Sequence, residues 1–131
     1  LSLTSPEKLL FEEQVEQVDL PGAEGDLGVL AGHAPIVALL RPGLITASNG
    51  AERETFVVLG GIAEFSSEKL TILAEFASHI AEFDIAELRA RISEMEEGLA
   101  GMTASEELDR AVARLDHYKS VEASLTAATA F

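Results

Sequence analysis

The chain has 131 residues, with 23 acidic and 9 basic side chains and a formal net charge of -14 at pH 7. This length suits one ordinary domain or two small ones, which would bury roughly two thirds of the unfolded surface. The negative charge repels nucleic-acid phosphates and anionic lipids, so it argues against nucleic-acid binding. Cysteine is absent, which excludes disulfides and thiolate metal sites. The longest apolar runs, such as residues 34–40, fall far short of the roughly 20 residues of a membrane-spanning helix.

The first part of the chain, as far as residue 83, has the pattern of short strands. β-Branched and apolar residues bounded by Gly, Asn or Ser occur at residues 13–20, 44–48, 55–59 and 69–76. The Asn-Gly pair within residues 48–52 and the sequence SSEK at 66–69 are typical of tight turns. Short strands at close spacing, with no long helix between them, predict an antiparallel β-sandwich or a flattened barrel.

The segment PGAEGDLGVLAGHAP, residues 21–35, holds four glycines, two prolines, two acids and a histidine. We expect this segment to be a loop. A phosphate-binding loop would carry a Lys, an Arg or an uncompensated helix N-terminus, whereas Glu24 and Asp26 stand here. Exposed carboxylates in an acidic chain are usually solvated or contact a partner, and the alternative is an acid and base pair for catalysis.

The second part of the chain, residues 84–131, has helical periodicity. Two apolar stripes with spacings of three and four predict two helices. They are Ile85, Leu88, Ile92, Met95 and Leu99, and then Leu108, Val112, Leu115, Tyr118, Val121 and Leu125.

The expected ends of these helices carry capping signals. Asp84 with Glu87 resembles one N-terminal capping box, and Thr103 with Glu106 resembles another. The sequence GLAG at 98–101 breaks the first helix. Matching stripes joined by a short connection predict an antiparallel hairpin, with the domain boundary at residues 83/84.

Signals for conventional catalysis or metal binding are scarce. His33, His79 and His117 lie far apart and fit no metal-ligand spacing such as H-E-x-x-H. The sequence contains no G-x-S-x-G elbow that would mark a nucleophilic serine. We therefore expect no metal site, no cofactor and no catalytic nucleophile.

Three motifs together carry a family resemblance. Residues 21–35, LRPG at 40–43 and VLGGIAEF at 58–65 closely resemble the epsilon subunit of bacterial F-type ATP synthases, equivalent to the delta subunit of the mitochondrial enzyme. The resemblance covers essentially the whole chain. It implies an N-terminal antiparallel β-sandwich followed by a C-terminal two-helix hairpin, and a non-catalytic rotor subunit.

The resemblance also implies partners and site residues. In this family the sandwich docks on the gamma subunit and stands on the polar loops of the membrane-embedded c-ring, so that proton-driven ring rotation turns the central shaft. It assigns Asp26 to the acidic c-ring contact, with Glu24, His33, Pro42 and Gly43 as neighbours in the c-ring and gamma interface. The glycines of the motifs would act as structural loop residues, namely Gly22, Gly25, Gly28, Gly32, Gly60 and Gly61.

The hairpin of some bacterial members extends along gamma to the alpha/beta catalytic hexamer and inhibits ATP hydrolysis. The resemblance makes Arg110, Arg114 and Lys119 candidates for inhibitory contacts, while the alternative is that they solvate the outer face of the hairpin. Some relatives bind ATP through the motif I-D-x-x-R-A. Residues 85–90 read I-A-E-L-R-A, with Ala86 in place of the aspartate, so we expect no nucleotide site.

Two functions from other classes stay open at this point. One is a free-standing protein-interaction module, and the other is a small β-sandwich enzyme that uses Glu24 and Asp26. Membrane association would occur through the complex only. The resemblance implies a peripheral position on the cytoplasmic face of the bacterial inner membrane, with the mitochondrial matrix face as the alternative.

Overall fold

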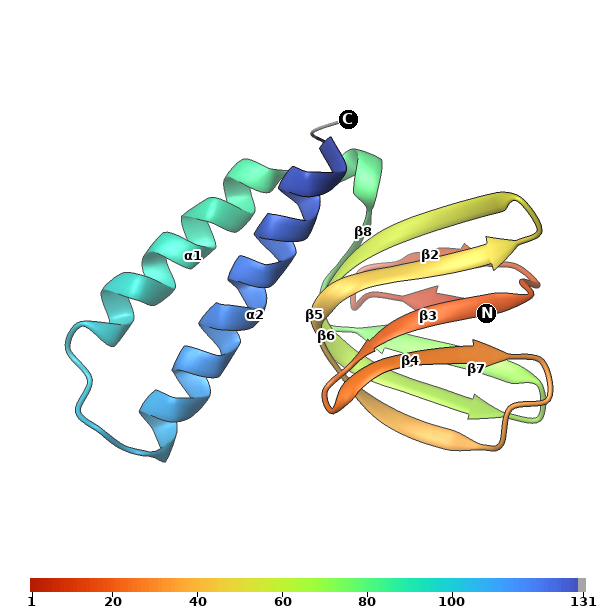
Figure 1. Ribbon diagram of the computed structural model, residues 1–131, viewed down its shortest axis with the longest axis horizontal. Helices are drawn as coiled ribbons and strands as arrows, with labels where there is room; N and C mark the ends of the chain where they lie inside the picture. Colours follow the sequence, from red (N-terminus) through yellow and green to blue (C-terminus); the bar gives the residue numbers. More distant parts are fainter. Residues whose placement is uncertain (130–131) are drawn as a thin grey trace. The chain divides into compact units, whose positions relative to one another are not determined.

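The computed structural model describes residues 1–129, with side chains described for residues 1–126 (Figure 1). It divides into two compact units, Leu1–Phe83 and Asp84–Phe131. In chain order the first unit contains β1 (Ser2–Thr4), β2 (Leu9–Glu12), β3 (Gln17–Gly22), β4 (Gly25–Leu30), β5 (Ile36–Asn49), β6 (Glu52–Ser66), β7 (Lys69–Ala74), β8 (Ala77–His79) and the short 3-10 turn η1 (Ile80–Glu82).

The strands of the first unit are hydrogen-bonded in the order β2-β1-β7-β6-β5-β3-β4, and β8 also pairs with β6. All of these pairings are antiparallel except β1 with β7, which is parallel and differs from the fully antiparallel prediction. The Asn-Gly turn is confirmed, because Gly50 between β5 and β6 has φ +66°. Strands β1, β2, β4 and β8 are short segments that the sequence analysis did not predict.

In the two longest strands, β5 and β6, the alternation of inward-facing and outward-facing side chains reverses partway along the strand. In β6 the core positions are Phe56 and Val58 before the change, and Ala63 and Phe65 after it. The alternation therefore shifts by one residue at the pair Gly60–Gly61. Figure 1 shows both strands bending sharply, so that their two halves diverge into different layers.

Glycine is required at this bend. Gly60 and Gly61 have φ +99° and +148°, a region that L side chains rarely adopt. A Cβ added at Gly61 would lie 2.4 Å from the carbonyl oxygen of Leu73 on the neighbouring strand. The bend turns one long ladder into two packed layers, as in an orthogonal sandwich.

An apolar core fills the space between these layers. Phe11 and Phe56 meet edge to face at its centre, with ring centroids 5.3 Å apart. No polar side chain is buried among the described residues. The core cluster consists of Leu3, Phe11, Val18, Leu20, Val29, Leu40, Ile45, Ala47, Phe56, Val58, Ala63, Phe65, Leu70, Ile72 and Ala74.

The described part of the second unit contains α1 (Ile85–Leu99) and α2 (Glu106–Thr129), which lie side by side and antiparallel in Figure 1. The buried side chains agree with most of the predicted stripes, although Val112 is exposed. Neither helix, over the described residues, is long and apolar enough to cross a membrane. The buried positions are Leu88 and Ile92 on α1, and Leu115, Tyr118, Val121 and Leu125 on α2.

One of the two predicted helix caps is confirmed and the other is wrong. The Oδ1 atom of Asp84 accepts hydrogen bonds from the backbone N–H groups of Ala86 and Glu87, at 3.0 and 3.3 Å. The second helix begins at Glu106, so its cap is Ser105 and not Thr103. Ser105 Oγ accepts the N–H of Leu108 at 3.1 Å, because a capping hydroxyl must directly precede the first helical residue.

Candidate interaction surface

Residues 21–30 of the segment predicted as a loop lie in a β-hairpin, and only residues 31–35 form a loop, between β4 and β5. Gly22 pairs with Gly25 and Pro21 pairs with Asp26, so the turn itself is only Ala23 and Glu24. A Cβ at Gly22 would lie 2.4 Å from the carbonyl oxygen of Gly25, which explains the glycine there. We call residues 22–26 the β3–β4 tip.

The tip is attached to β5 by one arginine and one backbone hydrogen bond. Arg41 donates from Nη1 to the carbonyl oxygen of Gly22 and from Nη2 to Oδ1 of Asp26, both at 2.5 Å. The N–H of Ala23 donates to the carbonyl oxygen of Leu39 at 2.8 Å. The Arg41 side chain is 29% exposed and that of Asp26 is 80% exposed. Asp26 is therefore half of an ion pair at the surface.

Sequence reasoning missed Arg41, although it lies inside the LRPG motif. Its two neighbours in the motif, Pro42 and Gly43, are half-buried in β5 and pair with Leu59 and Val58. A Cβ at Gly43 would lie 2.6 Å from Cβ of Pro21, so this glycine lets β3 cross β5 closely. Pro42 and Gly43 thus shape the support beneath the tip.

The predicted loop role of the glycines fails for most of them. Gly32 is in the loop between β4 and β5, while Gly22 and Gly25 are the strand ends that flank the tip turn. Gly28 lies within β4, and Gly60 and Gly61 lie within β6. The glycine-rich spacing concealed strands because it interrupts the apolar alternation on which a strand prediction depends.

His33 does not join Asp26 in one site. Asp26 is near the start of β4 and His33 follows the end of that strand, so about 13 Å of extended chain lies between Asp26 and Leu30 alone. The ring of His33 packs edge-on against Phe65, with centroids 5.9 Å apart, and its Nδ1 is 2.6 Å from the carbonyl oxygen of Ala34. The structure brings together Glu24 and Asp26 at the tip and leaves His33 apart.

A hollow of about 450 Å³ lies between the tip and the beginning of β5. One side is formed by residues 22–27, including Glu24 and Asp26, and the other by residues 36–39. His33 does not line it. The hollow therefore offers two carboxylates beside apolar side chains, and His33 lies outside it.

Four large apolar side chains form an exposed row next to this hollow. Leu39 of β5 pairs with Ile62 of β6, and Ile62 pairs with Leu73 of β7, so the three share one face of the sheet. Val37 lies two residues before Leu39 on the same face. Their exposed fractions are 70% for Val37, 65% for Leu39, 45% for Ile62 and 58% for Leu73. This apolar row has the character of an interaction surface.

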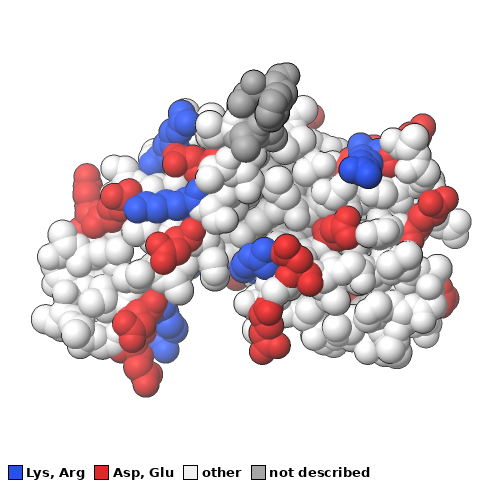
Figure 2. Space-filling model, viewed as in Figure 1, with Lys and Arg blue, Asp and Glu red and all other residues white. Residues whose placement is uncertain are grey.

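Charges and candidate metal ligands give no competing site. On the face drawn in Figure 2, basic side chains lie beside acidic ones and do not gather into a patch of their own. The described residues contain no group of three or more His, Cys, Asp or Glu side chains placed to hold a metal ion.

The basic residues of the hairpin have defined contacts. Arg114 donates from Nη2 to the Tyr118 hydroxyl at 3.2 Å, and its guanidinium is 5.5 Å from the centre of that ring. Lys119 Nζ is 4.0 Å from Oε1 of Glu96 on the other helix. Arg110 is exposed on α2. The hairpin itself therefore engages two of the three predicted inhibitory residues.

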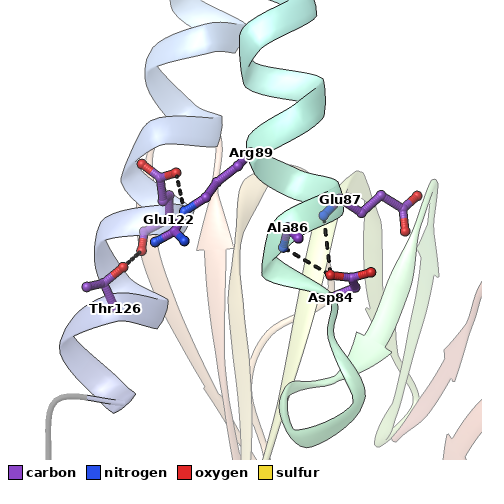
Figure 3. Close-up of polar contacts among 6 residues, drawn as sticks. All are labelled: Asp84, Ala86, Glu87, Arg89, Glu122 and Thr126. Carbon is purple, nitrogen blue, oxygen red and sulfur yellow. Dashed lines mark hydrogen bonds and ion pairs between the residues drawn. The ribbon is translucent and has the colours of Figure 1, made fainter.

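Figure 3 shows the polar contacts where α1 begins. Arg89 Nε lies 3.2 Å from Oε2 of Glu122, so an ion pair joins the two helices. Asp84 is used by the helix cap, and Ala86 supplies no side-chain oxygen. The arginine of the sequence I-A-E-L-R-A is thus held by a carboxylate of the same hairpin.

Comparison with known proteins decides the family. The model of the family described as ATP synthase, Delta/Epsilon chain, beta-sandwich domain, matches residues 1–80. ATP synthase epsilon chain 2 of Nitrobacter hamburgensis is 60% identical over 131 residues, which is 100% of this chain and 96% of that protein. The chain belongs to the ATP synthase epsilon chain family. An epsilon chain of Rhodopseudomonas palustris is 58% identical over 125 residues, covering 95% of this chain and 92% of the relative.

Two solved structures each contain a chain with a similar fold. A chain in the Euglena gracilis mitochondrial ATP synthase aligns with a TM-score of 0.74 at 24% identity, over 95% of this chain and 79% of that one. A chain of the Tetrahymena thermophila central stalk and c-ring aligns with a TM-score of 0.66 at 19% identity, over 98% and 93%. The predicted family resemblance and the predicted fold class are both confirmed. Epsilon chains are stalk subunits and not the catalytic subunits of the synthase, as the sequence predicted.

Proposed function

We propose that this chain couples rotation of the c-ring to the gamma shaft of a proton-translocating F-type ATP synthase, as a subunit of its central stalk. The observation that carries the proposal is the apolar row, an exposed surface on a sandwich that belongs to the epsilon chain family. Torque transmission needs an extensive joint, and obligate interfaces bury about 2,000 Å² or more. The surface through which one rotor subunit binds another should therefore be broad, apolar and rigid.

The apolar row would contact the gamma subunit. Full burial of one Leu, Ile or Val side chain contributes roughly 1.5–3 kcal/mol, so four of them together offset a large part of the cost of association. The sheet beneath holds these side chains on hydrogen-bonded neighbouring strands, so little entropy is lost when they dock.

The β3–β4 tip would contact the polar loops of the c-ring. Asp26 and Glu24 are exposed there, and a carboxylate at the edge of an interface sets register and specificity more than affinity. His33 would meet the same assembly at the far end of β4, which makes this contact an extended one. Replacement of Asp26 by lysine would weaken coupling for two reasons, since lysine reverses the charge and also repels Arg41.

The location follows from these partners. The chain would be a peripheral subunit on the cytoplasmic face of a bacterial inner membrane, held there by the complex. The mitochondrial matrix face is the alternative. Residues 120–131 carry no basic side chain that could meet acidic loops of the alpha/beta hexamer, so we propose that any inhibition by the hairpin is weak.

The decisive experiment is a titration of an epsilon-depleted ATP synthase, containing the catalytic sector, gamma and the c-ring, with the full chain. Complex formation and ATP hydrolysis are followed together. Saturable binding supports the stalk role, and a fall in hydrolysis on binding would add an inhibitory hairpin. An absence of binding would refute the proposal and favour a free-standing interaction module.

A further inference from the structure

Arg41 bridges an interruption in the sheet. β3 pairs with β5 in a regular ladder as far as Asp19 opposite Thr46, and pairing resumes only at Gly22 opposite Leu40 with a shifted register. Backbone hydrogen bonds are therefore interrupted where the tip begins. Beyond this break the backbone joins the tip to β5 at the Gly22–Leu40 pair and through the Ala23–Leu39 hydrogen bond, and a side-chain attachment would fix the tip further.

The contacts of Arg41 supply that attachment. One guanidinium bonds two groups of the tip at once, the carbonyl oxygen of Gly22 and the carboxylate of Asp26. A planar fork of donors can satisfy both groups in a fixed orientation, which a lysine ammonium on a flexible stem cannot do as well. Gly22 is buried, so the loss of this donor leaves a buried carbonyl oxygen without its side-chain partner.

The position of the tip sets the shape of the hollow beside the apolar row. Residues 22–27 form one wall, and the other wall includes Val37 and Leu39, two of the four side chains of the row. The N–H of Ala23 joins the two walls by its hydrogen bond to the carbonyl oxygen of Leu39, and the side chain of Arg41 links the tip to β5. A shift of the tip would close or widen the hollow.

We propose that Arg41 is a positioning residue for docking. It holds the β3–β4 tip so that the hollow beside the apolar row stays open for an apolar side chain of the gamma subunit, and so that Asp26 meets a hydrogen-bond donor of the c-ring loops. Arg41 acts through the tip and does not itself provide the contact. This inference rests on the proposed function, because the docking partner is the ATP synthase stalk.

The test compares Arg41→Gln and Arg41→Lys with a matched control, Arg53→Gln, which removes the same charge beside the turn that joins β5 and β6, away from the tip. Each full-length variant is measured for its dissociation rate from the epsilon-depleted synthase, its thermal midpoint, and hydrogen exchange at the Ala23 amide. We expect Arg41→Gln to dissociate about tenfold faster and the Ala23 amide to exchange faster. Arg41→Lys should fall between Arg41→Gln and the wild type.

The thermal midpoint separates positioning from folding. A midpoint equal to that of Arg53→Gln, with faster dissociation, supports a positioning role. A large drop in the midpoint would make Arg41 a residue of the fold and overturn the inference. If the wild type binds and Arg41→Gln dissociates at the same rate, the inference fails while the stalk function stands; if the wild type does not bind, the stalk function fails first.

The double variant Arg41→Gln with Asp26→Asn separates positioning from simple charge balance. The reference is Asp26→Asn alone, because Asp26 is itself a proposed contact. If Arg41 only neutralised Asp26, the double variant would dissociate at the same rate as Asp26→Asn. A positioning role predicts faster dissociation of the double variant, because the Gly22 carbonyl oxygen still lacks its donor. Equal rates for these two variants would therefore overturn the inference.

Discussion

The two units of this chain are held together in different ways. The sandwich joins residues that are distant in sequence, such as Ser2 beside Thr71, and its bends depend on glycines whose place no side chain could take. The hairpin joins two consecutive helices through one apolar seam, with exposed ion pairs such as Arg89–Glu122 across it. The contrast implies that the sandwich is rigid, as a docking surface should be. In the hairpin, by comparison, a single substitution should change stability without changing the fold.

The largest expected effect comes from replacing one glycine by alanine in each unit, which tests the contrast between them directly. Gly61→Ala places a Cβ 2.4 Å from a backbone oxygen at φ +148°, and we expect a loss of more than about 3 kcal/mol in unfolding free energy. Gly98→Ala lies in α1 with no atom within 4 Å of the added Cβ, so it should stabilise the hairpin by about 0.5–1 kcal/mol. Denaturant unfolding of the two variants measures both values. Equal effects would remove the distinction between the units.

The second prediction tests the apolar row without disturbing the fold. Leu39→Asp puts a charge where the partner would bury an apolar side chain, and we expect docking to weaken by about 2–3 kcal/mol, or roughly 30–150-fold in Kd. Leu9→Asp on β2 is the control, because Leu9 is exposed to a similar degree at 51% but lies outside the row. Equal losses in the two variants, in a binding titration with the epsilon-depleted synthase, would argue against the row as the docking surface.

A third, smaller effect concerns the start of α2. Ser105→Ala removes the hydroxyl that accepts the N–H of Leu108, and should lower hairpin stability by about 1 kcal/mol. Thr103→Ala should have little effect, because α2 begins after Ser105. Thermal unfolding followed by helical circular dichroism checks both variants, and a larger loss for Thr103→Ala would contradict the assigned cap.

The smallest effect belongs to the ion pair between the helices. Arg89→Glu and Glu122→Arg each place like charges together, whereas the double variant restores the pair with its polarity reversed. Because both side chains are substantially exposed, we expect a coupling of only about 0.3–0.5 kcal/mol that weakens at high salt. A double-mutant cycle measured at low and high ionic strength would show it. A coupling of several kcal/mol would mean that this ion pair matters as much for the stability of the hairpin as the bend glycines do for that of the sandwich.

The hairpin could be predicted from sequence in more detail than the sandwich. Helical spacing is local, so the apolar stripes and the Asp84 cap follow from residues that are close together in the chain. The contacts at the tip are not local. Arg41 and Asp26 are 15 residues apart and lie on different strands, and no sequence pattern marks the shift in the β3–β5 register near them.

The apolar row was hidden for a related reason. Val37, Leu39, Ile62 and Leu73 are ordinary strand residues, and their types do not say whether they point into the core. Their direction depends on the bend at Gly60–Gly61, which resets the alternation of β6. The family resemblance supplied the function, but the surface that would perform it required the three-dimensional register.

The number of residues at the Gly60–Gly61 bend decides which side chains of β6 face outward. The bend contains one extra residue, which shifts the inward and outward alternation of β6 by one position. For this reason Ile62 faces outward and Ala63 faces inward. Deletion of a single glycine there would exchange these two directions for the rest of the strand. The large side chain would then enter the core and the small one would meet the partner, so a change that removes no contacting side chain would erase the interaction surface.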